Sequence, residues 1–162
     1  MAIHKLHLDE FEETKFHLIA IHTSLEDYRL AYFINQKLPI NLSKCKNEIQ
    51  IRVRDGETQF VRYVYEHEKK DIQWNLIQNK NEIFHKIKIG NQGLFADTQN
   101  SFASKVYLLP EFKKVDYFLK IENTNNSIEI AEITSLLNTI ERVTTVYSIE
   151  FENIKSKNNL IF

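Results

Sequence analysis

The sequence predicts an α+β fold in which two helices pack on one face of a mostly antiparallel sheet. Apolar residues alternate along several short segments in the middle of the chain, and two longer segments, one near each end, have helical spacing. Each helical segment lies between predicted strands, so a strand–helix–strand unit opens the domain and another closes it. This order suggests a ferredoxin-like or ACT-like topology with inserted hairpin strands. The 162 residues suit one domain, with residues 1–15 at its periphery.

The first unit begins with a predicted strand over residues 16–22. Its apolar side chains alternate between two faces, Leu18 with Ala20 and Ile19 with Ile21. A strand that is apolar on both faces is typical of a sheet that is covered on both sides.

A helix is predicted next, over residues 25–37. It starts at two overlapping capping-box patterns, Thr23 with Glu26 and Ser24 with Asp27. Pro39 ends it, because the residue before a proline is disfavoured in helical geometry. Its apolar positions form two stripes, Leu25 with Tyr28 and Tyr32, and Leu30 with Phe33, Ile34 and Leu38.

The middle of the chain is predicted to form a meander. Strands are expected over residues 49–53, 58–66, 72–77 and 83–89. Asp55 and Gly56 favour a tight hairpin turn between the first two strands, because such turns need positive φ angles. Residues 79–81 predict another turn, and residues 90–104 have no clear period and predict a long loop.

The second unit is predicted to start with a strand over residues 115–122. A short strand at residues 105–109 and a single helical turn at residues 110–114 come before it. Asn126 with Glu129 predicts the start of a helix whose apolar stripe is Ile130, Ile133, Leu137 and Ile140. Residues 142–151 predict the last strand.

The composition argues against several classes of function. A net charge of −1 gives no field to attract nucleic acid or an anionic membrane, and three glycines are too few for a phosphate-binding loop. No apolar run has the length of a signal peptide or a membrane span. Cys45 is the chain's single cysteine, which excludes an intrachain disulfide and suits the cytoplasm. We therefore expect a cytoplasmic protein with no metal and no cofactor.

The densest motif of the chain is LPEFKKVDYFLKIE, at residues 109–122. It resembles the signature of the bacterial IPExxxVDY family, which is named after that motif, with Leu109 where the name has isoleucine. Residues 21–32 resemble the family's opening strand and helix, and residues 155–162 resemble its closing segment. The resemblance spans nearly the whole chain and implies a family, but it carries no catalytic assignment. The candidate functional residues of the motif are Pro110, Glu111, Asp116 and Tyr117.

Two groups of side chains are candidates for acid–base chemistry. One is the carboxylate pair of Glu111 and Asp116. The other lies where the first strand meets the first helix, a common ligand site in α/β folds, and comprises His22, Glu26, Asp27 and Arg29. The structural alternative is that the acids of both groups stabilise helix ends and local turns.

The meander offers an RNA-binding alternative. Arginines near the predicted hairpin could hold phosphates while neighbouring rings stack on bases, and these residues are Arg52, Arg54, Arg62, Tyr63, Tyr65 and Trp74. The competing interpretation is that the arginines line a solvated face and the rings pack inward. The alternation favours it, since Arg52 and Arg54 oppose the apolar face of their own strand.

Three large apolar residues, Leu160, Ile161 and Phe162, follow a polar run near residue 155. We expect them to dock on a groove of the domain, on a second copy of the chain or on a partner. The leading hypothesis is a cytoplasmic, non-catalytic module that binds a partner protein or a small ligand, with a homodimer as one arrangement. An enzyme using His22 with Glu26, or Glu111 with Asp116, and an RNA-binding protein are the alternatives.

Overall fold

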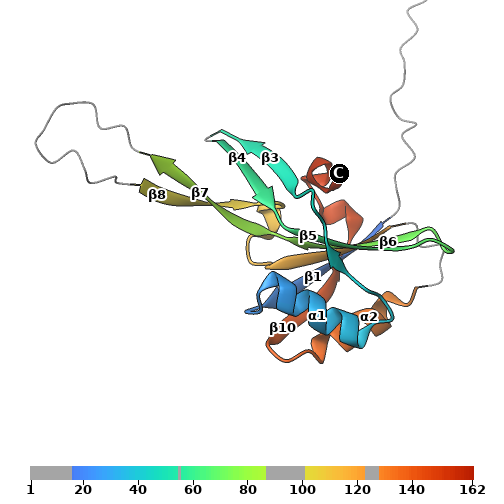
Figure 1. Ribbon diagram of the computed structural model, residues 1–162. Coiled ribbons are helices and arrows are strands. Elements are labelled where there is room, and N and C mark those ends of the chain that lie inside the picture. The colour runs from blue at the N-terminus through green and yellow to red at the C-terminus, as the bar shows by residue number, and fades with distance from the viewer. Residues whose placement is uncertain (1–15, 55, 87–100, 123–127) are drawn as a thin grey trace, which may run out of the picture.

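The computed structural model describes residues 16–54, 56–86, 101–122 and 128–162 (Figure 1). Within these residues the fold is α+β, with a six-stranded antiparallel sheet, two α-helices and two further β-hairpins. The sheet has the strand order β10-β1-β9-β6-β5-β2. Its strands are β1 (Phe16–Thr23), β2 (Ser43–Lys44), β5 (Arg62–His67), β6 (Ile72–Gln78), β9 (Tyr117–Glu122) and β10 (Val143–Ile149). The predicted fold class is therefore confirmed.

The helices α1 (Asp27–Lys37) and α2 (Ile130–Asn138) cover the same face of this sheet, as Figure 1 shows. They bury an apolar stripe against it, made of Leu30, Ala31, Ile34, Ile133 and Leu137. The strands contribute Ile19, Ile21, Trp74, Leu76, Leu119 and Ile121 to this first core. Tyr28 and Tyr32 lie on the opposite side of α1, where both are more than half exposed.

A second core covers the other face of the sheet. Leu18, Ala20, Ile77 and Phe118 point into it from the strands, and Leu108, Leu109, Val115, Ile154 and Leu160 close it from the loops. The strand β1 is thus apolar on both faces because each face has a core of its own.

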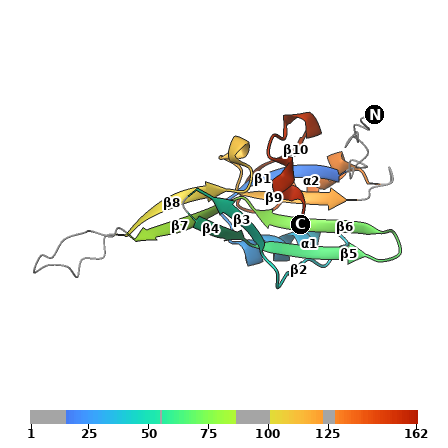
Figure 2. The ribbon, with the colours of Figure 1, turned by 90° about the horizontal axis from the view of Figure 1, so that it is seen from above.

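The remaining strands form two hairpins that extend from one end of the sheet (Figures 1 and 2). One joins β3 (Ile49–Val53) to β4 (Gly56–Phe60), and the other joins β7 (Lys80–Lys86) to β8 (Ser101–Tyr107). Gly56 has a φ of +146° where it pairs with Val53, a conformation that L-residues with a side chain rarely adopt.

Both helices begin later than their capping patterns predict. The N-cap of α1 is Glu26, and among the described residues its side chain makes no capping hydrogen bond. Thr23 Oγ1 instead accepts the N–H of Leu25 and donates to the carbonyl of Arg142. The N-cap of α2 is Glu129, and the predicted cap at Asn126 lies outside the described residues. The capping prediction for α1 was wrong because the hydroxyl is used before the helix starts.

Three predictions for the meander also need correction. The strand expected over residues 58–66 is divided into β4 and β5, because β4 pairs with β3 whereas β5 pairs with β6 and β2. The turn expected at residues 79–81 is a junction between β6 and β7. Residues 101–104, expected in a loop, belong to β8, and residues 87–100 lie outside the described residues. Pairing over long distances along the chain decided each of these cases.

No helix in the described part of the chain is long and apolar enough to cross a membrane.

Candidate functional site

A network of hydrogen bonds joins the motif loop, residues 108–117, to Asn79, and we call the loop and Asn79 together the motif junction. Asn79 is fully buried between β6 and β7. Its Nδ2 donates to the carbonyls of Phe112 and Val115, each at 2.9 Å, and its Oδ1 accepts the N–H of Leu109 at 2.9 Å. Its own N–H donates to the carbonyl of Asp116. One amide side chain therefore holds both ends of the motif loop.

Asp116 connects this junction to the start of the first helix. Its Oδ2 accepts the N–H of Thr23 at 2.9 Å, and its Oδ1 forms an ion pair with Lys80 Nζ at 2.6 Å. Its backbone N–H donates to the carbonyl of Ile21. The carboxylate is thus bonded on both oxygens by neighbouring strands.

Glu111 connects the junction to the closing segment, residues 155–162. It lies in a single 3₁₀ turn, η1 (Pro110–Phe112), with exposed Pro110 at its start. Its Oε1 accepts the N–H groups of Lys155 and Ser156 at 2.7 and 2.8 Å, and its Oε2 accepts the Ser156 hydroxyl at 3.0 Å. Burial alone would raise the pKa of Glu111, but these donors outweigh it and lower that pKa below its usual value.

Two tyrosines tie the start of α1 to the sheet. Tyr117 Oη donates to the carbonyl of Leu25 at 3.1 Å, and Tyr63 Oη donates to Asp27 Oδ2 at 3.2 Å. Burial, with the Asp27 charge, raises the pKa of Tyr63 to about 12 and that of Tyr117 further. Both phenols therefore stay protonated at neutral pH and act as hydrogen-bond donors.

The proposed cluster at the first helix is not brought together. His22 alternates with Ile21 on β1 and therefore points away from the helices, where its ring stacks on Tyr147 at 5.7 Å. Glu26 lies beside the exposed Tyr28 on the helix side, and its carboxylate raises the pKa of that phenol through a hydrogen bond. Arg29 is exposed to solvent on α1. A proton relay from His22 to Glu26 has no geometric basis here, and Glu111 and Asp116 bond to different partners.

The closing segment is held by a buried lysine of the central strand β9. Lys120 Nζ forms an ion pair with Glu122 at 2.5 Å and donates to the carbonyl of Leu160 at 2.7 Å. The rings of Phe16 and Phe162 lie at 5.0 and 4.8 Å from the ammonium. Burial lowers the pKa of Lys120, although Glu122 opposes this shift. Sequence patterns do not predict this role, because they show Lys120 only as one position of an alternating strand.

The three apolar residues of the closing segment have different environments. Leu160 is buried in the second core, whereas Ile161 is 77% exposed and Phe162 is 44% exposed. The Phe162 ring also lies 4.7 Å from the guanidinium of Arg62. Leu160 thus docks on the domain itself, and Ile161 stays in solvent.

The residues named for the RNA-binding alternative do not form one face. Arg62 and Tyr63 are neighbours on β5 and point to opposite faces of the sheet, and both Tyr63 and Trp74 are packed in the first core. Arg52 forms an exposed ion pair with Glu57 on the β3–β4 hairpin. The arginines and the rings therefore do not share a surface on which bases could stack.

A groove of about 280 Å³ opens between α2, the end of α1 and the β5–β6 hairpin, and we call it the helix–hairpin groove. Its apolar lining consists of Leu38, Pro39, Ile40, Tyr65, Ile72, Trp74, Ile128, Ile133 and Leu136. Its polar lining consists of His67 and Lys70 from the hairpin and Glu129 and Glu132 from the start of α2. None of these four side chains has an ion pair or hydrogen bond within the described residues.

The sequence did not point to this groove. Its apolar residues match the patterns of a core strand and a core helix, and residues 66–71 match a charged turn. The groove arises because α2 and the hairpin meet at the same end of the sheet, which only the strand order determines.

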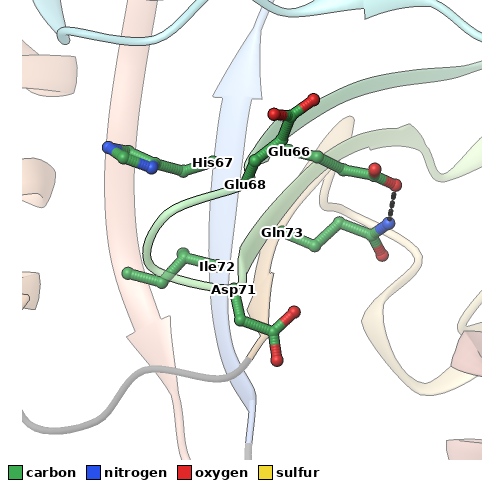
Figure 3. Close-up of a pocket in the computed structure, with 6 residues that line it drawn as sticks. All are labelled: Glu66, His67, Glu68, Asp71, Ile72 and Gln73. Atoms are coloured by element: carbon green, nitrogen blue, oxygen red, sulfur yellow. Dashed lines mark hydrogen bonds between the residues drawn. The ribbon is translucent and has the colours of Figure 1, made fainter.

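A smaller pocket of about 230 Å³ lies on the tip of the β5–β6 hairpin (Figure 3). Figure 3 shows that His67 and Ile72 point to one side of the hairpin, while Glu66 and Gln73 point to the other and share a hydrogen bond of 2.6 Å. His67 and Ile72 line the helix–hairpin groove as well. The carboxylates here diverge, and in the described ranges no group of three or more His, Cys, Asp or Glu side chains could hold a metal ion.

Comparison with known proteins identifies no relative, because no family model, no curated protein and no solved structure matches the chain.

Proposed function

We propose that this chain is a non-catalytic binding module and that its ligand site is the helix–hairpin groove. The observation that carries this proposal is an aromatic and aliphatic groove that opens to solvent beside Lys70, Glu129 and Glu132, three charged side chains that form no ion pair or hydrogen bond in the described part of the chain. Ligand sites are typically concave and mainly apolar, with a few polar groups that orient the ligand. The groove meets this description.

The non-catalytic part of the proposal is supported by the state of the motif acids. Both oxygens of Asp116 and both oxygens of Glu111 accept hydrogen bonds from the chain itself. A general base must instead reach a proton of the substrate. These carboxylates stabilise the junction, and the protein needs no reaction to account for them.

We also propose that the chain belongs to the IPExxxVDY family and has a ferredoxin-like core. The family is supported by the motif at residues 109–122, and the core by the order β10-β1-β9-β6. In that order β9 lies between β1 and β6, and β1 lies between β9 and β10, so two split β–α–β units interlock. The strands β2 to β5 and the β7–β8 hairpin are then insertions. We further propose a cytoplasmic location, which the single cysteine suits.

Trp74 gives a direct test, since it is the chain's single tryptophan and lines the groove. The protein is titrated with the neutral apolar dye N-phenyl-1-naphthylamine while the emission of Trp74 is followed. We expect saturable quenching with one site per chain, and we expect Leu136→Gln to weaken it by about tenfold through the loss of apolar contact. Ile40→Gln, on another wall of the groove, serves as a second blocking variant.

Ile161→Gln is the control, because Ile161 is exposed and does not line the groove. Circular dichroism melts establish that every variant is folded. Quenching that is absent, or that is equally strong in both blocking variants, would show that the groove is not a binding site.

A further inference from the structure

We infer that the helix–hairpin groove binds a small zwitterion with an apolar body, which rests on the binding function proposed above. The cationic group of the ligand faces Glu129 and Glu132, its anionic group faces Lys70, and its apolar body covers Trp74.

The polar groups around the groove come from two different elements. Lys70 and the imidazole of His67 belong to the β5–β6 hairpin, and Glu129 and Glu132 belong to the start of α2. Acidic residues at a helix start have a structural explanation in the helix dipole. That explanation does not account for a lysine on the facing element, which places both signs of charge at the edge of one apolar groove.

The two signs of charge select among ligands. A simple anion would meet the carboxylates of α2, and a simple cation would meet Lys70. Either simple ion therefore brings like charges together, which is unfavourable. A ligand that carries both charges is instead complementary to both elements. The apolar surface between them then requires an apolar body.

The size of the groove indicates a small molecule. Pockets for drug-sized ligands have volumes of roughly 300–1,000 Å³, and this groove has about 280 Å³. A stable protein partner buries on the order of 1,200 Å² or more. A ligand of the size of a free amino acid with a large side chain is therefore the appropriate probe.

The test uses three probes that share the side chain of phenylalanine and differ in charge, and Trp74 emission reports their binding. L-Phenylalanine carries both charges, L-phenylalaninamide lacks the carboxylate, and N-acetyl-L-phenylalanine lacks the ammonium. We expect the zwitterion to bind most tightly, by about three- to fivefold over each single-charge probe, as for partly solvated ion pairs.

Variants then assign each end of the ligand. Lys70→Met should weaken binding of L-phenylalanine and of the N-acetyl probe by about threefold, and it should slightly strengthen binding of the cationic amide, because it removes a like charge. Glu132→Gln should weaken binding of L-phenylalanine and of the amide, and it should slightly strengthen binding of the anionic N-acetyl probe for the same reason. The matched controls are Lys69→Met and Glu141→Gln, because these side chains are exposed and do not line the groove.

The outcomes separate this inference from the proposed function. If Leu136→Gln weakens binding of the dye but the three probes bind alike or not at all, the groove binds another class of ligand and the inference of a zwitterionic ligand is wrong. That inference is also wrong if Lys70→Met and Glu132→Gln have the same effect on every probe. If the dye fails to bind, the proposed function fails as well.

Discussion

The motif junction and the helix–hairpin groove differ in whether their polar side chains have partners within the chain. In the junction, Asn79, Glu111 and Asp116 have hydrogen-bond partners from the chain itself on their side-chain polar atoms. In the groove, Lys70, Glu129 and Glu132 lie beside an apolar surface without any ion pair in the described residues. The polar side chains of the motif junction are therefore satisfied within the chain, whereas those of the helix–hairpin groove are available to a ligand.

The difference teaches which residues serve stability and which are available for a ligand. A buried polar group costs free energy unless it is hydrogen-bonded, so the junction must satisfy its own groups in order to fold. Charges at the edge of a groove are solvated and need no partner. A mutation should therefore affect stability in the junction and binding in the groove.

The largest effect is expected for Asn79→Ala. This change removes the Asn79 side chain from the buried N–H of Leu109 and from the carbonyls of Phe112 and Val115, of which, among the described residues, only Phe112 keeps another donor, the N–H of Val115. It should lower the free energy of unfolding by about 3–5 kcal/mol. Urea unfolding followed by circular dichroism measures it, with Asn153→Ala at an exposed position as the control. A loss below 1 kcal/mol would mean that water can replace the amide and that the junction is not saturated.

Leu160→Ala should have the next largest effect. Leu160 is 1% exposed in the second core, and removing such a side chain costs about 2–4 kcal/mol. Ile161→Ala, at the exposed neighbouring position, should stay within about 0.5 kcal/mol. Equal effects of the two substitutions in the same unfolding experiment would contradict the docking of the closing segment through Leu160.

Glu111→Gln should cost about 1 kcal/mol at neutral pH, and the cost should depend on pH. A glutamate in an unfolded chain has a pKa of about 4.3. The pKa of Glu111 is lower in the folded protein than in the unfolded chain. Its contribution is fully present above the unfolded pKa and is lost as the pH falls through the lower folded pKa. Stability curves of the two proteins should therefore converge in acid, and parallel curves would argue against the role of the charge.

The smallest effect on stability is expected in the groove. Lys70→Met and Glu132→Gln should each change the free energy of unfolding by less than about 0.5 kcal/mol, because the side chains are exposed and unpaired within the described residues. Thermal melts measure it. A loss above 1 kcal/mol would show that these charges stabilise the fold, and the contrast between the two regions would disappear.

Prediction from the sequence succeeded where one short segment carries the signal. The alternation along β1 predicted a core on each face, and the alternation along β9 placed Tyr117, Leu119 and Ile121 on one side. It failed at Asn79, because an asparagine between polar neighbours is typical of a turn. The buried role of Asn79 depends on a loop that lies 30 to 36 positions further along the chain.

The candidate site residues show the same division. Glu111 and Asp116 were recognised as important, but their partners were not predictable. Asp116 bonds to Thr23 across 93 positions, and Glu111 bonds to Ser156 across 45. The groove was not predicted at all, since its walls come from a hairpin and a helix that match ordinary core and turn patterns.

Local pattern was sufficient for the fold class, the central strands and the apolar stripes of the helices. These features depend on how apolar and polar side chains repeat along one strand or one helix. That repeat can be read directly from the order of residues. The partners of the buried polar groups and the position of the groove required the complete fold. Hydrogen bonds and cavity walls join segments that are remote in the chain, and their geometry exists only after the strands have paired.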